Sequence, residues 1–201
     1  MDENDLMSPT GADPNGTKKK RLVVALVSLA VVVVLAVACA LILKEFVFTS
    51  YMVDGESMLP TLNGGETGVT DDGDKLFLDM VKTPDRGDIV VFYYDWNASD
   101  DPYFAPHHLV KRVIAIAGDR VEIISGTLYI NGEAQEEDYI LERMDSRADG
   151  LSLTVPEGHF FVLGDNRNNS TDSRVIGCVP EENIVGTCFL IASPSGKLRI
   201  P

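Results

Sequence analysis

An uninterrupted apolar run at residues 22–43 directly follows the four cations Lys18 to Arg21. At about 1.5 Å per helical residue this run spans roughly 33 Å, which matches the hydrocarbon core of a bilayer. The sequence therefore predicts a single membrane-spanning helix over residues 22–43. The cations precede the run and only Lys44 follows it closely, so the positive-inside tendency predicts a cytoplasmic N-terminus and an extracytoplasmic remainder.

Two other interpretations of the apolar run compete with a membrane-spanning helix. Ala36-Val37-Ala38 and Ala38-Cys39-Ala40 resemble the small-x-small sites of cleaved secretory signals, but the apolar part of such signals is usually about 7–15 residues long. Cys39 also suggests a lipoprotein, although the apolar run continues past it and the residue three before it is Ala36 rather than a bulky aliphatic. We therefore favour the uncleaved helix.

The rest of the chain divides into a short tail and one acidic domain. Residues 1–21 are mostly polar and show no apolar period, which predicts a disordered cytoplasmic tail. This tail contributes four charges of each sign, so the formal net charge of −14 arises wholly within residues 44–201. Such a charge disfavours nucleic-acid binding. The length of residues 44–201 suits one extracytoplasmic domain with its own core.

Residues 44–201 show short apolar runs separated by Gly, Asp and Pro rather than helical periodicity. This pattern predicts a mainly β domain, antiparallel and barrel-like or sandwich-like, with a hairpin turn at Asn131-Gly132. Residues 95–108 and 133–152 are predicted to be insertions between strands. Phe46, Phe48 and Tyr51 fit an interfacial aromatic belt, the beginning of a first strand, or both. The predicted strands are 75–81, 88–94, 109–117, 120–124, 127–130, 159–163 and 184–192.

The two cysteines of the β domain, Cys178 and Cys188, lie in neighbouring predicted segments. A disulfide between them is one possibility in an exported domain, and two free thiols are the other. We expect no zinc site, because no CxxC pair or histidine cluster lies near them.

Ser57 and Lys111 are the residues that point to chemistry. Ser57 lies in Gly55-Glu56-Ser57-Met58-Leu59-Pro60-Thr61-Leu62, where a non-regular turn would present its hydroxyl, although a lone serine more often only turns the chain. Lys111 lies among aliphatic residues of a predicted strand. Burial would favour its neutral form, which can accept the proton of a serine hydroxyl without any histidine. The alternative is that Lys111 extends its amine to solvent at the strand end.

A third polar run, residues 164–174, follows the apolar residues 160–163. Its acids and arginines can form ion pairs with one another or with Arg112, and Ser170 or Ser173 can donate a hydrogen bond to a neutral amine. The alternative is an ordinary solvated loop.

Together with Arg86-Gly87-Asp88-Ile89-Val90, these three runs resemble, in order, the motifs of the bacterial type I signal peptidases. The motif around the lysine runs from Lys111 to Ala115 and on through Gly118-Asp119, and the last motif runs from Gly164 to Arg174. Members of that family are membrane-anchored serine proteases that remove signal peptides from exported proteins. The resemblance covers the apolar run and essentially all of residues 44–201, and it implies the signal peptidase fold.

The resemblance also implies a role for each matching residue. Ser57 would be the nucleophile and Lys111 the general base. Ser170 would orient the lysine amine. Some members carry, at the position of Gly55, a residue whose hydroxyl donates to the oxyanion. In this chain the oxyanion hole would instead consist of the Ser57 backbone N–H and an unidentified second donor. Asn168 stands where other members often carry Asp. The supporting residues are Gly55, Arg112, Asp165, Ser170, Asp172 and Arg174, with the ion pairs Asp165–Arg112 and Asp172–Arg174.

The implied reaction is acyl transfer through an acyl-enzyme, without a metal or a cofactor. Its substrates would be pre-proteins that carry a signal peptide with small residues at the first and third positions before the cleaved bond. Met58, Leu59 and residues near Val110 would line the binding pockets. We expect a monomer at the membrane lipid surface and no nucleic-acid partner.

Three alternatives stay open at this point. His107, His108 or His159 could serve as the base in place of Lys111. The chain could be a non-catalytic, membrane-anchored β module for binding or assembly. A specialised peptidase with a narrow set of substrates would share the same chemistry.

Overall fold

The computed structural model describes residues 14–65, 72–95 and 107–201. It divides the chain into two compact units, residues 1–44 and 45–201, which are taken separately below. The first 13 residues of the expected tail and most of the expected insertion at 95–108 lie outside the described residues.

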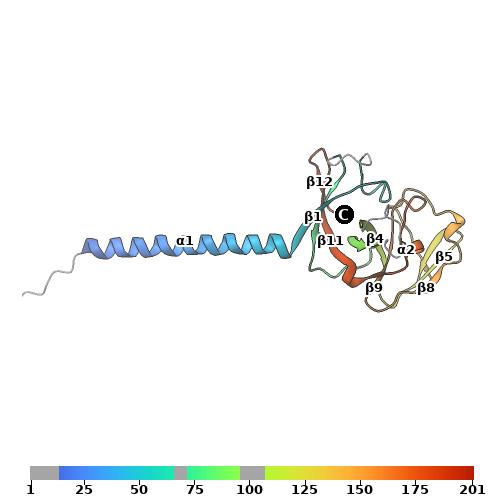
Figure 1. The fold of residues 1–201 in the computed structure, drawn as a ribbon, viewed down its shortest axis with the longest axis horizontal. Helices are drawn as coiled ribbons and strands as arrows, with labels where there is room; N and C mark the ends of the chain where they lie inside the picture. The colour runs from blue at the N-terminus through green and yellow to red at the C-terminus, as the bar shows by residue number, and fades with distance from the viewer. Residues whose placement is uncertain (1–13, 66–71, 96–106) are drawn as a thin grey trace, which may run out of the picture. The chain divides into compact units, whose positions relative to one another are not determined.

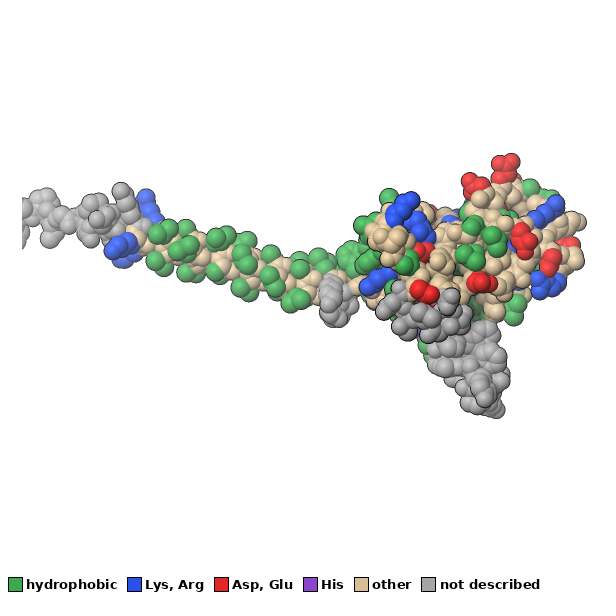
Figure 2. Space-filling view, turned by 90° about the horizontal axis from the view of Figure 1, so that it is seen from above, with side chains coloured by type: hydrophobic (Ala, Val, Ile, Leu, Met, Phe, Trp, Pro, Cys, Tyr) green, Lys and Arg blue, Asp and Glu red, His purple; other side chains and the backbone are tan. Residues whose placement is uncertain are grey.

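The first unit contains one long helix, α1 (Pro14–Phe46). It is longer at both ends than the predicted 22–43, so the assignment of residues 14–21 to a disordered tail is wrong. Proline is well tolerated in a first helical turn, and lysine and arginine are good helix formers, which explains the earlier start. The part from Lys19 to Leu43 is long and apolar enough to cross a membrane. Figure 2 shows hydrophobic side chains along this helix, preceded by cations.

The second unit is mainly antiparallel β structure and begins with a large sheet (Figure 1). Neighbouring strands in this sheet follow the order β1-β2-β11-β3-β4-β9-β10, and β12 pairs with β11. Its strands are β1 (Phe48–Met52), β2 (Lys75–Asp79), β3 (Ile89–Tyr94), β4 (His107–Ala115), β9 (His159–Leu163), β10 (Val179–Pro180), β11 (Ile184–Ala192) and β12 (Leu198–Arg199).

A smaller sheet in the order β7-β6-β5-β8 packs against the large one. The turn between β6 and β7 is Asn131-Gly132, and both residues have positive φ, as a two-residue hairpin requires. Its strands are β5 (Arg120–Ile124), β6 (Thr127–Ile130), β7 (Glu133–Ala134) and β8 (Ser152–Thr154). The remaining elements are the short helix α2 (Ser173–Ile176) and the 3₁₀ turns η2 (Ser146–Ala148) and η3 (Glu181–Asn183).

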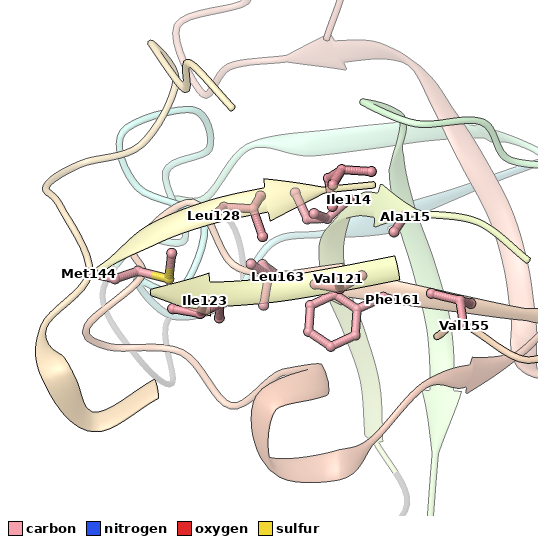
Figure 3. Close-up of a cluster of buried hydrophobic side chains, with 10 residues drawn as sticks. Ile114, Ala115, Val121, Ile123, Leu128, Met144, Val155, Phe161 and Leu163 are labelled. Carbon is pink, nitrogen blue, oxygen red and sulfur yellow. The ribbon is translucent and has the colours of Figure 1, made fainter. Parts of the chain in front are cut away.

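Buried aliphatic and aromatic side chains join the two sheets (Figure 3). Phe161 and Leu163 of β9 are fully buried against Val121 and Ile123 of β5. Because β9 pairs with β4, this core fixes the strand that carries Lys111 and the loop that follows β9.

The large sheet curls without closing. β1 and β4 are separated by three strands in the sheet order, yet the rings of Tyr51 on β1 and His108 on β4 lie 4.9 Å apart. The predicted mainly β, antiparallel domain with one N-terminal apolar helix is confirmed, and barrel-like describes the curled sheet only loosely. Tyr51 and Phe48 belong to a first strand, as one of the two interpretations expected.

Cys178 and Cys188 are free thiols. Cys178 packs against the core between the sheets, whereas Cys188 lies in a separate cluster with Leu78 and Ile191. The structure therefore agrees with the second possibility considered from the sequence, two free thiols and no disulfide.

Two adjacent isoleucines of β5 test the core between the sheets. Ile123 is fully buried and Ile124 is 53% exposed. We expect Ile123→Ala to lower the free energy of unfolding by about 2–5 kcal/mol, because it removes buried methyl groups and leaves a cavity. The matched variant Ile124→Ala should change it by less than about 0.5 kcal/mol. Urea unfolding of the detergent-solubilised protein measures both, and equal losses would contradict this packing.

Candidate active site

Ser57 lies on an irregular turn between β1 and β2. Its carbonyl oxygen accepts a hydrogen bond of 3.0 Å from the backbone N–H of Asn166, and the Asn166 side chain donates to the Glu56 carbonyl at 3.1 Å. Gly55 adopts φ +81°, a left-handed conformation that favours glycine. The turn that carries the serine is thus attached to the loop after β9.

Lys111 lies in the middle of β4, opposite Val90 of β3, and only 2% of its surface is exposed. Its Nζ atom is 2.8 Å from Ser57 Oγ and 2.8 Å from the Val110 carbonyl oxygen. The amine therefore does not extend to solvent, and that alternative is wrong. A serine hydroxyl and a lysine amine at this distance can exchange a proton directly.

The surroundings of Lys111 favour its neutral form. The pKa of its amine is lowered from 10.5 to about 8, mainly by burial. This value already includes the opposing effect of the nearby carboxylates Asp172 and Asp165 and a smaller lowering by Arg174. A substantial fraction of the amine is consequently uncharged in mildly alkaline solution.

Arg112, the residue after Lys111, forms a buried ion pair with Asp165. Arg112 Nε and Nη2 donate to the two carboxylate oxygens at 2.9 and 2.7 Å, and Nη1 donates to the Gly87 carbonyl at 2.9 Å. Asp165 is completely buried. This pair links β4 to the loop after β9, and it is one of the two ion pairs that the resemblance implied.

The second implied ion pair, Asp172–Arg174, lies in the same loop. Arg174 Nε and Nη2 donate to Asp172 at 2.8 and 2.7 Å, and Asp172 Oδ2 also accepts from the Gly164 backbone N–H at 3.0 Å. Gly164 itself has no room for a side chain: a Cβ atom there would lie 2.5 Å from the Ser57 carbonyl oxygen and 2.2 Å from Ser170 Oγ. Glycine at this position thus lets the loop approach the serine closely.

Ser170 does not meet the expectation that it donates to Lys111. Its hydroxyl oxygen is buried beside Gly164 and forms no hydrogen bond with any residue that the structure describes. Ser173, the other serine considered, accepts instead from the Val162 backbone N–H at 2.9 Å.

A cavity of about 130 Å³ lies next to Ser57 and Lys111, between β1 and β4. Val110 lines it, as expected, but Met58 and Leu59 do not. Met58 is fully buried in the core because the turn directs its side chain inward, and Leu59 is half-buried. The residues that line the cavity are Tyr51, Met52, Val53, Asp54, Ser57, Leu76, Val91, His108, Leu109, Val110 and Lys111.

The described histidine side chains have partners other than Ser57. His108 lines the cavity but contacts the rings of Tyr51 and Tyr93, and His159 Nδ1 lies 2.9 Å from the Glu157 carbonyl oxygen. The side chain of His107 lies outside the described residues. Lys111 is therefore the better candidate for the base.

Near the site lie Asn168, which the sequence showed as a departure from the family motif, and two residues that carried no signal in the sequence. Asn168 donates from its amide to the Arg143 carbonyl and to Glu142, which the carboxylate of an aspartate could not do. Glu137 and Tyr139, in the predicted insertion, contact Arg167 and Arg112. Glu137 and Tyr139 were missed because they lie in an acidic segment without a pattern.

Comparison with known proteins identifies the family. The family model described as signal peptidase, peptidase S26, matches residues 26–192. The chain belongs to this family. It is 35% identical over 199 residues to signal peptidase I S of Bacillus subtilis, covering 92% of this chain and 96% of that protein. It is 37% identical over 180 residues to signal peptidase I of Bacillus amyloliquefaciens, covering 83% and 85%.

A crystal structure of a signal peptidase I from Enterococcus faecalis is also similar, with 34% sequence identity and a TM-score of 0.44 over 53% of this chain and 97% of that one. Peptidases of this S26 family are membrane-anchored serine endopeptidases that act on signal peptides, and the apolar helix of this chain fits such an anchor. The non-catalytic β module is therefore the weaker of the two functional interpretations.

The buried ion pair of this S26 peptidase predicts a large effect on stability. Arg112→Ala leaves the buried Asp165 without its partner, which should lower the free energy of unfolding by about 3–5 kcal/mol. Arg120→Ala is the matched control, since the Arg120 side chain is 60% exposed in its pair with Glu122 and should contribute less than about 1 kcal/mol. Denaturant unfolding compares the two variants, and similar losses would show that the buried pair is not required.

Proposed function

We propose that this chain removes signal peptides from exported pre-proteins through a catalytic dyad of Ser57 and Lys111. The observation that carries the proposal is the 2.8 Å contact between Lys111 Nζ and Ser57 Oγ at a buried position. Membership of the signal peptidase family supports the reaction class, and the geometry supports these two residues for it.

In the proposed mechanism, the neutral Lys111 amine accepts the Ser57 hydroxyl proton as Ser57 Oγ attacks the carbonyl carbon before the cleaved bond. The tetrahedral intermediate collapses when the ammonium of Lys111 protonates the leaving amine. The signal peptide is then attached to Ser57 as an ester, and the mature protein departs with a free amino terminus. Lys111 next takes a proton from a water molecule as the water oxygen attacks the ester carbon. When the bond between that carbon and Ser57 Oγ breaks, the Lys111 ammonium returns the proton to Ser57 Oγ and the signal peptide leaves with a free carboxylate.

The oxyanion would be stabilised by backbone donors. Gly55 offers no hydroxyl, so we assign the Ser57 backbone N–H as the first donor. The Ser57 carbonyl is held by Asn166, and this contact supports a fixed orientation of the neighbouring peptide groups.

Ser170 remains the candidate for orienting the Lys111 amine during the reaction. A buried hydroxyl without a partner is unfavourable, and this one lies beside Gly164, which adjoins the Ser57 carbonyl oxygen. The Ser170 oxygen would accept from an N–H of the neutral amine, which leaves the single lone pair of that amine free for the Ser57 proton.

The cavity between β1 and β4 is the proposed site for the signal peptide residues before the cleaved bond. Its backbone edges at Met52 to Asp54 and at His108 to Val110 suit an extended peptide between them. Its volume of about 130 Å³ is small, which suits the small residues expected at the first and third positions before the cleaved bond.

The apolar helix would place this reaction at the membrane surface. We propose that the N-terminus is cytoplasmic and the β domain extracytoplasmic, because four cations, Lys18 to Arg21, precede the apolar run and only Lys44 follows it closely. Only a short segment of the chain separates Ser57 from residue 43, the end of the apolar run. Enzyme and signal peptide would therefore share one bilayer surface. We expect a monomer to suffice, since Ser57 and Lys111 come from the same chain.

Cleavage of a pre-protein with an Ala-x-Ala site tests the proposed function. We expect the full-length protein in detergent to release the mature protein, and Ser57→Ala to lower the rate by at least about a thousandfold, because the nucleophile is lost. Ser50→Ala, on β1, is the control and should retain activity. Cleavage by Ser57→Ala at the wild-type rate, or none by the wild type, would contradict the proposal.

The pH dependence of cleavage tests the base. The rate should fall about tenfold per pH unit below an apparent pKa near 8, because the protonated Lys111 amine cannot accept a proton. Lys111→Arg, which stays charged, should be inactive throughout, whereas Lys82→Arg at an exposed ion pair should match the wild type. An apparent pKa near 6.5 that survives substitution of Lys111 would instead indicate a histidine.

A further inference from the structure

Segment 137–141, in the insertion between β7 and β8, lies against the loop that follows β9. The backbone N–H of Leu141 donates to the Asp165 carbonyl oxygen at 3.0 Å, and two side chains of the segment reach the arginines that support the site. We refer to residues 137–141 as the docking segment.

The first of these side chains, Tyr139, covers Arg112. Its ring centroid lies 4.2 Å from Arg112 Cζ, which is the distance of a close cation–π contact. The edge of the same guanidinium donates to Asp165 and to the Gly87 carbonyl. The ring therefore covers one face of the cation next to Lys111, and the Arg112 side chain is only 10% exposed.

The second side chain, Glu137, neutralises Arg167. Its two oxygens accept from Arg167 Nη1 and Nη2 at 2.7 and 2.6 Å, and one of them also accepts from the Tyr139 hydroxyl at 2.7 Å. Arg167 is 1% exposed, and its Nε donates to the Gly164 carbonyl at 3.0 Å. Glu137 thus holds the cation that fixes the glycine packed against Ser57.

We propose that Tyr139 and Glu137 are positioning residues for the cleavage reaction. Tyr139 acts through Arg112 on Asp165, and Glu137 acts through Arg167 on Gly164. Both paths end beside the Ser57–Lys111 contact. The inference rests on the proposed dyad and adds to it a segment that comes from outside the matching motifs.

Loss of the Tyr139 ring should raise the pKa of the Lys111 amine. The charged groups that act on Lys111 are Asp172, Asp165 and Arg174, and burial is the largest influence on its pKa. Removing the ring would loosen the Arg112–Asp165 pair and admit water. The charge of Asp165 would then be less well compensated and the Lys111 amine would be more hydrated. Both changes favour the charged amine and so raise its pKa. Cleavage should then require a higher pH.

The experiment compares pH profiles of pre-protein cleavage by the full-length protein in detergent. Tyr139→Leu should lower kcat about tenfold or more at neutral pH and raise the apparent pKa by about half a unit, with a smaller change in KM. Tyr139→Phe keeps the ring over Arg112 and should restore the wild-type pKa. Tyr129→Leu, at a half-buried tyrosine of β6, is the control and should not shift the profile. If Tyr139→Leu does not fold, Tyr139→Met carries the same expectation.

Two outcomes separate this inference from the proposed function. A wild-type profile without a titration near pH 8 would overturn the dyad itself. A wild-type profile with that titration, together with an unshifted Tyr139→Leu profile and a rate loss no greater than that of Tyr129→Leu, would overturn only the positioning role. Thermal unfolding of each variant shows whether a rate loss merely follows a loss of folded protein.

Discussion

Lys111, whose Nζ atom contacts Ser57 Oγ, can be neutral only if its amine is kept out of water. Burial alone would lower the pKa of Lys111 strongly, whereas Asp172 and Asp165 would keep the amine charged if they acted without partners. Arg174 and Arg112 neutralise these two carboxylates through paired hydrogen bonds. The value of about 8 is thus the balance between a dry environment and carboxylates whose charge is already compensated.

This balance requires segments that are distant in the sequence to meet. Ser57 comes from the turn after β1, Lys111 from β4, and the carboxylates from the loop after β9. The curled sheet brings β1 toward β4, and the core between the sheets fixes β9 beside β4. Gly164 then allows the loop to reach the Ser57 carbonyl, because a side chain there would collide with it. Packing far from the site therefore determines the geometry of the contact between Ser57 and Lys111.

The sequence predicted the features that have a local pattern. The apolar helix, seven of the eight strands with four or more residues and the Asn131-Gly132 turn follow from hydropathy and turn chemistry, and the motifs identified Ser57 and Lys111. The eighth, β1, was only one of two interpretations of its residues. The short strands β7, β8, β10 and β12 have two or three residues each, too few to show an alternation. Met58 adjoins Ser57 in sequence but faces the core, since neighbouring residues in a turn point in different directions. The partners of Arg112 and Arg167 in the docking segment arise only from tertiary packing.

Three buried arginine–carboxylate pairs surround a single loop, namely Arg112–Asp165, Arg167–Glu137 and Arg174–Asp172. Such pairs add little stability compared with apolar residues of similar volume, because desolvation offsets their attraction. Their value here is specificity: each bidentate pair holds a polar loop in one arrangement inside a dry region. Each of these carboxylates already has an arginine partner, and among the described residues Lys111 belongs to no ion pair. The arginines thereby leave the lysine as the cation that can lose its proton, which is the property a base beside Ser57 needs.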